Sequence, residues 1–182
     1  SPFKKVIKDK FYNTTIIADS FHFTRIVMNA LDELRLNLWR NTKGKEKTYF
    51  KYLKNSLMKD SSKAKFKDLE KLNYAFQVSP ILKYAYDLKQ NFLDIKKKKT
   101  FKEKEHAFKN WLNEAESSTI KEFKTTVKTL RQWHKYISNA FELNLSNGPV
   151  EGKNNLIKTL KRISFGFKKL SNLRARILLC EL

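Results

Sequence analysis

The chain has 182 residues, 41% of them hydrophobic, which is enough for a packed core and excludes a disordered polymer. Only 4 glycines and 3 prolines occur, which favours long helices over many short strands. The 39 Lys+Arg against 18 Asp+Glu give a net charge of +21, and a single cysteine excludes an internal disulfide and a multi-cysteine zinc site.

The positive charge indicates a polyanionic partner, most simply DNA or RNA. The alternatives are an anionic membrane surface and a lysine-rich composition with no specific anionic partner. The sequence shows no 18-residue apolar run and no signal peptide, so we expect a cytoplasmic protein without a membrane partner. Because it begins Ser-Pro without Met, we also expect part of a longer protein.

Three elements are predicted at the start of the chain. An apolar stripe predicts a short basic helix over residues 2–11. The β-branched run at 14–18 is apolar on both faces, which predicts a buried strand. Apolar residues then repeat at intervals of three and four, which predicts a long helix over about 21–40.

Further helices are predicted through the middle of the chain. Apolar spacing predicts one over about 46–58, and Ser79 followed by Pro80 predicts the start of another, as N-cap and N1. The lysine run from Lys96 to Lys99 is either a solvated linker, which we favour, or a cluster that contacts phosphate.

Two capping-box patterns predict the next helix starts. Thr100-x-x-Glu103 opens a helix with a buried aromatic stripe, and Thr119-x-x-Glu122 opens a long helix that continues past Ile137. A loop over 142–148, a helix over about 149–163 and a final helix over about 171–181 complete the chain.

Asp19 directly follows the predicted strand. A carboxylate at the C-terminal end of a strand, where a sheet opens, is a common active-site position. Asp is also a frequent N-cap, and Asp19 is placed to cap the helix that starts near Ser20. From these residues alone, a catalytic role and a capping role for Asp19 are equally well supported.

Glu151 lies in the first turn of the helix predicted over 149–163. With Gly148 as N-cap and Pro149 as N1, Glu151 takes the N3 place of a capping box. A polar stripe on the same face of the helix favours a functional role instead. It continues from Glu151 through Asn154, Asn155, Lys158 and Arg162. Both interpretations stay open at this point.

Two sequence blocks carry a resemblance to a known family. They are Ile16-Ile17-Ala18-Asp19-Ser20-Phe21-His22-Phe23 and Ser146-Asn147-Gly148-Pro149-Val150-Glu151-Gly152-Lys153-Asn154-Asn155, the second followed by Lys161-Arg162-Ile163-Ser164-Phe165-Gly166-Phe167. They resemble the C-terminal part of a bacterial insertion-sequence DDE transposase with Asp-x-Phe-His and Ser-Asn-Gly-x-x-Glu-Gly-x-Asn-Asn blocks. The likeness covers essentially the whole chain. Ser20 and Pro149 depart from the family's usual residues but leave both carboxylates in place.

The resemblance implies a mainly α chain that contains a partial ribonuclease-H-like α/β fold, with one or a few strands, and a large all-helical insertion. Residues 1–22 would be a partial core with a helix, a strand and the second catalytic aspartate. Residues 23–141 would be the helical insertion. Residues 142–182 would be C-terminal helices of the core that carry the catalytic glutamate.

The resemblance also implies metal-dependent DNA cleavage and strand transfer during transposition. Asp19 and Glu151 would be catalytic and would hold Mg²⁺ or Mn²⁺, ions that prefer carboxylate oxygens. Two such ions activate the attacking hydroxyl and neutralise the leaving oxygen. The first catalytic aspartate would lie upstream of Ser1, so we expect the isolated chain to bind metal weakly and to be inactive.

The implied partners are DNA, as the transposon's terminal inverted repeats and the target, and further copies of the chain in a homo-oligomer. His22 and Asn147 are expected beside the carboxylates, and His22 either bonds near Asp19 or contacts DNA. Salt-sensitive DNA contacts are expected from residues around the Glu151 helix, namely Lys153, Asn154, Asn155, Lys158, Lys161, Arg162, Lys168 and Lys169.

Two functions of other classes compete with a transposase. The first is a non-catalytic, basic, helical nucleic-acid-binding module in which Asp19 and Glu151 only cap helices. The second is a helical protein–protein interaction domain whose charge is incidental. Affinity for DNA at low salt separates the second from the others.

Overall fold

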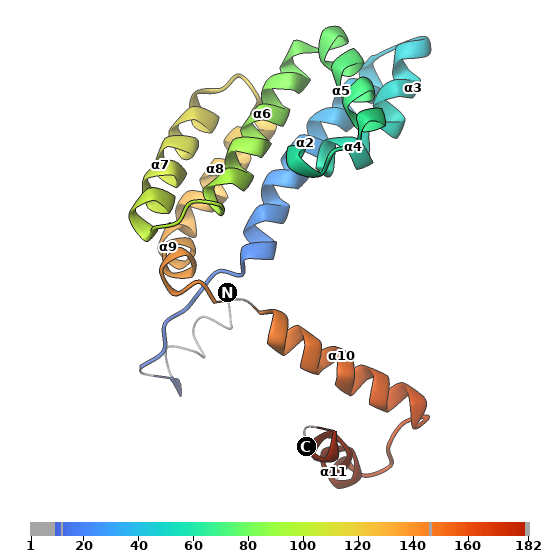
Figure 1. Cartoon of the computed structure of the whole chain (residues 1–182), viewed down its shortest axis with the longest axis vertical. Coiled ribbons are helices and arrows are strands. Elements are labelled where there is room, and N and C mark those ends of the chain that lie inside the picture. The colour runs from blue at the N-terminus through green and yellow to red at the C-terminus, as the bar shows by residue number, and fades with distance from the viewer. Residues whose placement is uncertain (1–9, 12, 146, 181–182) are drawn as a thin grey trace. The chain divides into compact units, whose positions relative to one another are not determined.

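The computed structural model describes residues 10–11, 13–145 and 147–180, which fall into two compact units, one up to Asn144 and the other from Leu145 onward. The described residues are mainly α-helical, as the sequence predicted, and none of them forms a β-strand (Figure 1). The helix predicted over 2–11 lies almost entirely outside the described residues. The ribonuclease-H-like core and the three-part division of the chain stay predictions.

Four helices make the centre of the first unit: α2 (Ser20–Asn41), α6 (Pro80–Ile95), α7 (Phe101–Ser117) and α8 (Lys121–Gln132). Helices α2 and α7 each pack against both α6 and α8, so the four close into a bundle (Figure 1). Each helix turns one apolar stripe inward and its polar face outward, which is how bundles bury a core.

Aromatic rings fill this core. The ring of Phe92 lies 4.7 Å from Trp111, 6.1 Å from Phe23 and 6.2 Å from Phe108, measured between centroids, and all these contacts are edge-to-face. Such pairs contribute about 0.5–1.5 kcal/mol each beyond the area they bury. Trp111 also donates from Nε1 to the Leu88 carbonyl at 2.7 Å, which satisfies its buried indole.

Three further helices pack beside the bundle: α3 (Lys45–Tyr52), α4 (Lys54–Met58) and α5 (Phe66–Val78), with the 3-10 helix η1 (Ser61–Lys63) between the last two. The single helix predicted over 46–58 is therefore wrong, because the chain breaks at Leu53. Nη1 of buried Arg35 donates to the Phe50 carbonyl at 2.9 Å. This bond supplies the partner that Phe50 loses where α3 ends.

The start of α5 is held by one carboxylate. Asp68 accepts hydrogen bonds from Lys59 Nζ at 2.6 Å, Ser56 Oγ at 2.7 Å and the Lys65 backbone at 3.1 Å. These bonds, led by that from Lys59, hold the pKa of the Asp68 carboxyl well below its usual range. Because Ser56 and Lys59 precede η1, the carboxylate fixes the connection between α4 and α5.

One predicted capping box is confirmed and the other is wrong. Thr100 Oγ1 accepts from the Glu103 backbone at 3.2 Å, and Glu103 accepts from the Thr100 backbone at 3.0 Å. Helix α8, however, begins at Lys121 without a side-chain cap. Glu122 instead accepts from Asn37 Nδ2 of α2 at 2.6 Å, because packing brings a better donor within reach.

The long helix predicted from Thr119 also ends early. It breaks at Trp133, and α9 (His134–Leu143) continues in a new direction. The break lets α9 pack against α7 as well as α8 and bury Ile137, Ala140 and Phe141 in the core. Ala140 and Phe141 would have been carried away from the bundle by a straight continuation of α8.

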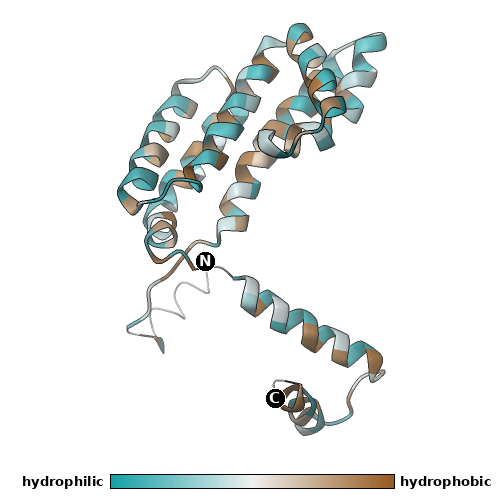
Figure 2. Ribbon diagram, viewed as in Figure 1, coloured by the Kyte–Doolittle hydropathy of each residue, from teal (hydrophilic) through white to brown (hydrophobic). Residues whose placement is uncertain are grey.

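The second unit consists of α10 (Gly148–Ile163) and α11 (Leu170–Leu179), which pack against each other. Helix α10 ends in a Schellman motif, in which Gly166 N donates to Lys161 O at 2.9 Å and Phe165 N to Arg162 O at 3.1 Å. Apolar and polar segments alternate along α10 (Figure 2). Among the described residues, no helix is long and apolar enough to cross a membrane.

Candidate functional site

The segment before Asp19 is extended but is not the predicted strand. The Ala18 backbone donates to the Tyr136 carbonyl at 2.9 Å, and Asn139 Nδ2 donates to the Ile16 carbonyl at 2.9 Å. Both partners belong to α9. The prediction of a strand at 14–18 is wrong for this structure, because a strand needs a neighbouring strand and no described residue supplies one.

Asp19 caps α2, so the predicted capping role is confirmed. Its backbone is extended, and its Oδ1 atom accepts from the Phe21 backbone N–H at 3.1 Å. The other carboxylate oxygen, Oδ2, is buried and has no hydrogen-bond partner in the described structure. Nε2 of His22 lies 3.7 Å from it, beyond hydrogen-bonding distance, and the His22 side chain is 63% exposed.

A buried carboxylate oxygen without a partner is costly, about 1–3 kcal/mol or more for a charged group. Such a group in a folded protein calls for an explanation, and an absent ion is one. Carboxylate oxygens are the ligands that Mg²⁺ prefers, so Asp19 fits one position of a metal site. No cluster of three or more His, Cys, Asp or Glu suited to a metal occurs among the described residues.

Lys96 is the charged residue near Asp19 that sequence reasoning missed. Its Nζ atom donates to the Ser20 carbonyl at 3.2 Å and lies 5.3 Å from the Phe23 ring centre. Burial lowers the pKa of Lys96, and the negative charge of Asp19 opposes that shift. The preferred interpretation of Lys96 as part of a solvated linker is therefore wrong, and only the packing of α2 on α6 reveals it.

Glu151 belongs to the second unit and is described within it. The N-cap of α10 is Asn147 rather than the predicted Gly148, and no side-chain hydrogen bond is made at that cap. The Glu151 backbone donates to the Asn147 carbonyl at 2.9 Å, and its exposed carboxylate does not close a capping box. The predicted N3 role is wrong, because the helix begins one residue earlier.

A basic and amide-rich face extends along α10 from Glu151. The helix is continuous from Gly148 to Ile163, so residues spaced four, seven and eleven positions after Glu151 share one side of it. The predicted DNA-contacting residues are all exposed, both along the helix and beyond it: Lys153, Asn154, Asn155, Lys158, Lys161, Arg162, Lys168 and Lys169. They are sterically available to a polyanion.

Comparison with known families identifies the chain. The model of the DDE_Tnp_ISL3 family, described as a transposase, matches residues 1–177. The chain belongs to this transposase family. The match covers the helical bundle and nearly all of α10 and α11, and it bears out the resemblance to insertion-sequence DDE transposases.

Other comparisons are more limited. A protein of Lactococcus lactis subsp. lactis named "ATP-dependent protease" is 34% identical to this transposase-family chain over 101 residues. Those residues are 56% of this chain and 31% of the relative, so the chain matches less than a third of that protein's length. No solved structure matches the chain.

Proposed function

We propose that this transposase-family chain supplies two carboxylates, Asp19 and Glu151, to the site that cuts and joins DNA during transposition of an insertion sequence. The buried, unpartnered Oδ2 of Asp19 is the observation that carries the proposal. It is a buried carboxylate oxygen that accepts no hydrogen bond from the described residues, and Nε2 of the largely exposed His22 ring lies 3.7 Å away. Membership of the transposase family makes a metal-dependent DNA reaction the natural use of that oxygen.

Each half of the proposed site has a distinct task. Asp19 offers Oδ2 to a divalent ion while its Oδ1 remains bound to the Phe21 N–H, which fixes the orientation of the carboxylate. Glu151 offers a second carboxylate from the first turn of α10. Bound Mg²⁺ or Mn²⁺ would supply Lewis-acid activation of the attacking hydroxyl and neutralisation of the leaving oxygen.

The exposed face of α10 is proposed to hold the DNA backbone. Lys158 and Arg162 lie one helical turn apart, and Lys161 adds a third positive charge beside them. Contacts of this kind position a duplex without reading its sequence. The natural substrates are then the transposon's inverted repeats and target DNA, handled in the cytoplasm by a homo-oligomer of the full-length protein.

Strand transfer by the full-length protein tests the assignment. We expect Asp19→Asn and Glu151→Gln each to abolish strand transfer while DNA affinity stays within about twofold of the wild type, because contacts with phosphate come from other residues. Glu142→Gln, an exposed glutamate at the end of α9, is the matched control and should retain activity. Strand transfer retained by either carboxylate variant would refute its role as a metal ligand.

The rival function is a non-catalytic DNA-binding module, and the capping of α2 by Asp19 is the observation in its favour. It predicts that Asp19→Asn, which keeps the cap, leaves every DNA-dependent activity intact. The name of the Lactococcus relative, "ATP-dependent protease", adds proteolysis as a further rival. Cleavage of casein in the presence of ATP would support that rival, and we expect no cleavage.

A further inference from the structure

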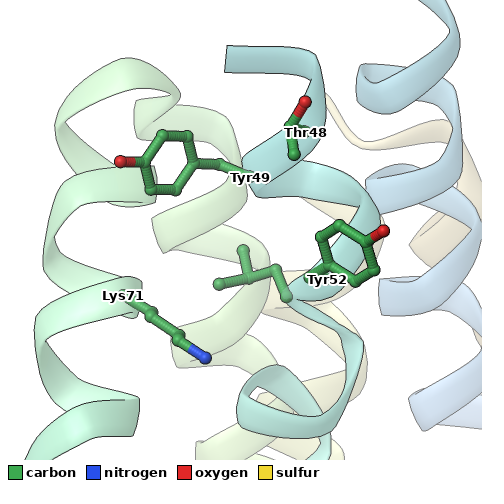
Figure 3. A pocket seen from close by; sticks show the side chains of 5 residues that line it. Thr48, Tyr49, Tyr52 and Lys71 are labelled. Carbon is green, nitrogen blue, oxygen red and sulfur yellow. The ribbon is translucent and has the colours of Figure 1, made fainter. Parts of the chain in front are cut away.

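A cavity of about 300 Å³ opens between α3 and α5 in the first unit, away from Asp19. Its lining comprises Thr48, Tyr49, Tyr52, Leu53 and Lys71 (Figure 3). The volume lies at the small end of the range for ligand sites, where one flat ring or a short side chain fits. Neither the proposed carboxylates nor the face of α10 takes part in it.

Two tyrosines make part of the lining of the cavity aromatic. Tyr49 and Tyr52 are three residues apart on α3, and both side chains line the cavity (Figure 3). Tyr74 of α5 lies against the Tyr49 ring with a centroid distance of 4.4 Å. Tyr52 is 66% exposed. An aromatic ring so open to water is available to stack on a planar ligand.

Lysines surround these rings. Between residues 43 and 54 the sequence has five lysines and one glutamate. Lys51 Nζ lies 5.3 Å from the centre of the Tyr52 ring, and exposed Lys71 reaches from α5 into the cavity (Figure 3). A planar ligand with an attached negative charge is complementary to this combination of rings and ammonium groups.

We infer that the cavity binds an unpaired nucleobase of DNA, stacked on Tyr52, while Lys71 and Lys51 contact the adjoining phosphates. Exposed aromatic rings beside lysines are the usual means of holding single-stranded nucleic acid, because every base has a face to stack and every nucleotide has a charge. The lysine surplus favours this occupant over an apolar peptide, which would gain nothing from Lys51 and Lys71. The inference does not depend on the proposed roles of Asp19 and Glu151.

The test compares DNA ends in the full-length protein. Fluorescence anisotropy would measure affinity for a blunt duplex and for the same duplex with a short single-stranded overhang carrying 2-aminopurine. We expect Tyr52→Leu to weaken binding of the overhang DNA about tenfold, the loss typical of one base–aromatic stack, and to change blunt-duplex affinity less than about twofold. Wild-type protein should also quench 2-aminopurine fluorescence, and Tyr52→Leu should not.

Matched controls separate stacking from other effects. Tyr84→Leu removes a tyrosine of α6 that is 36% exposed and does not line the cavity, and it should bind both DNAs as the wild type does. Tyr52→Phe keeps the ring and should also behave as the wild type does. Lys71→Gln should weaken overhang binding, whereas Lys128→Gln, on exposed α8 surface, should not change the preference for the overhang.

Three results would overturn the inference. They are unchanged overhang affinity in Tyr52→Leu, an equal loss for blunt and overhang DNA, and retained quenching of 2-aminopurine. An equal loss would assign the tyrosines to general contacts with the duplex. Unchanged DNA binding together with loss of a protein complex on gel filtration would make the cavity a site for a protein partner. None of these measurements involves strand transfer, so failure of the catalytic proposal is a separate outcome.

Discussion

Oδ2 of Asp19 and Nε2 of His22 are 3.7 Å apart at the first turn of α2, too far for a hydrogen bond. The same carboxylate bonds through Oδ1 to the Phe21 N–H. One oxygen of Asp19 therefore caps the helix through a hydrogen bond, and the other makes no hydrogen bond with any described residue. The two contributions can be separated by substitution.

Asp19→Ser should make the chain more stable in metal-free buffer. Ser retains an oxygen that can cap α2, and it removes the buried, unpartnered Oδ2, so we expect the free energy of unfolding to rise by about 1 kcal/mol. Asp19→Ala loses the cap as well and should be about 1 kcal/mol less stable than the Ser variant. Urea denaturation in EDTA measures both, and a clearly destabilised Ser variant would mean that Oδ2 has a stabilising partner.

The stability of the first unit should rise with pH between about 7 and 10. Lys89 is fully buried, and burial lowers its pKa to about 7, while the charge of Asp60 acts in the opposite direction. Its Nζ atom donates to the Lys59 carbonyl at 2.6 Å and lies 4.3 Å from the Tyr86 ring centre. Over this pH range the unfolded chain binds a proton at Lys89 that the folded chain does not, so raising the pH favours folding.

Lys89→Met is the variant that isolates this effect. It removes the titrating group from the core, so its stability should depend less steeply on pH than that of the wild type between pH 7 and 9. The variant should gain most relative to the wild type at pH 6–7, where the buried ammonium is charged. Chemical denaturation at several pH values measures the slope, and parallel curves for the two proteins would contradict the low pKa. Lys83→Met, at an exposed position of α6, is the control.

The turn after α10 stores backbone strain at one residue. Phe165 adopts φ = 50°, a left-handed conformation that suits glycine, and its side chain is fully exposed. Phe165→Gly should stabilise the end of α10 by about 0.5–1 kcal/mol, since relief of a cost of roughly 1–2 kcal/mol outweighs the greater flexibility of unfolded glycine. Hydrogen exchange of the last turn of α10 is the measurement.

Gly166→Ala is the complementary change in the same turn. Gly166 has φ = 95°, and a Cβ added there would meet no atom within 4 Å. Any destabilisation therefore reports backbone strain alone, and we expect about 1 kcal/mol. Equal stability of this variant and the wild type would indicate that the turn relaxes to another conformation.

The face of α10 should impose a measurable salt dependence on DNA binding. If Lys158 neutralises one phosphate, Lys158→Gln should reduce the slope of log affinity against log salt by about 0.9. The loss of affinity should be the same for any DNA sequence, because a phosphate contact carries no base information. Lys124→Gln on α8 is the control, and an unchanged slope in Lys158→Gln would remove Lys158 from the interface.

Sequence patterns predicted correctly those helix ends that depend only on residues close by in the sequence. The Thr100 and Glu103 pair forms its own capping box within four residues, and the stripe of α2 buries Phe23, Val27 and Leu31 as its spacing predicted. The Thr119 box failed because Glu122 bonds to Asn37, which is 85 positions away in the sequence. No local pattern carries that information.

The sequence predicted some residues of the candidate site and missed others, because it does not show contacts between residues that are far apart in the chain. The identity of Asp19 and Glu151 as candidates came from sequence blocks, and their catalytic roles remain predictions. Lys96 was missed because it approaches Ser20 only through the packing of α2 on α6, across 76 positions of sequence. The unpartnered state of Asp19 Oδ2 is likewise a property of burial, which sequence patterns do not report.

The hydrogen bond between the Ala18 N–H and the Tyr136 carbonyl joins two points 118 positions apart in the chain, where the helical bundle starts and where its final helix begins. The segment that enters the bundle and the start of its final helix, α9, therefore lie next to each other. An element with adjacent ends can be gained, lost or exchanged in evolution without pulling apart the segments it interrupts.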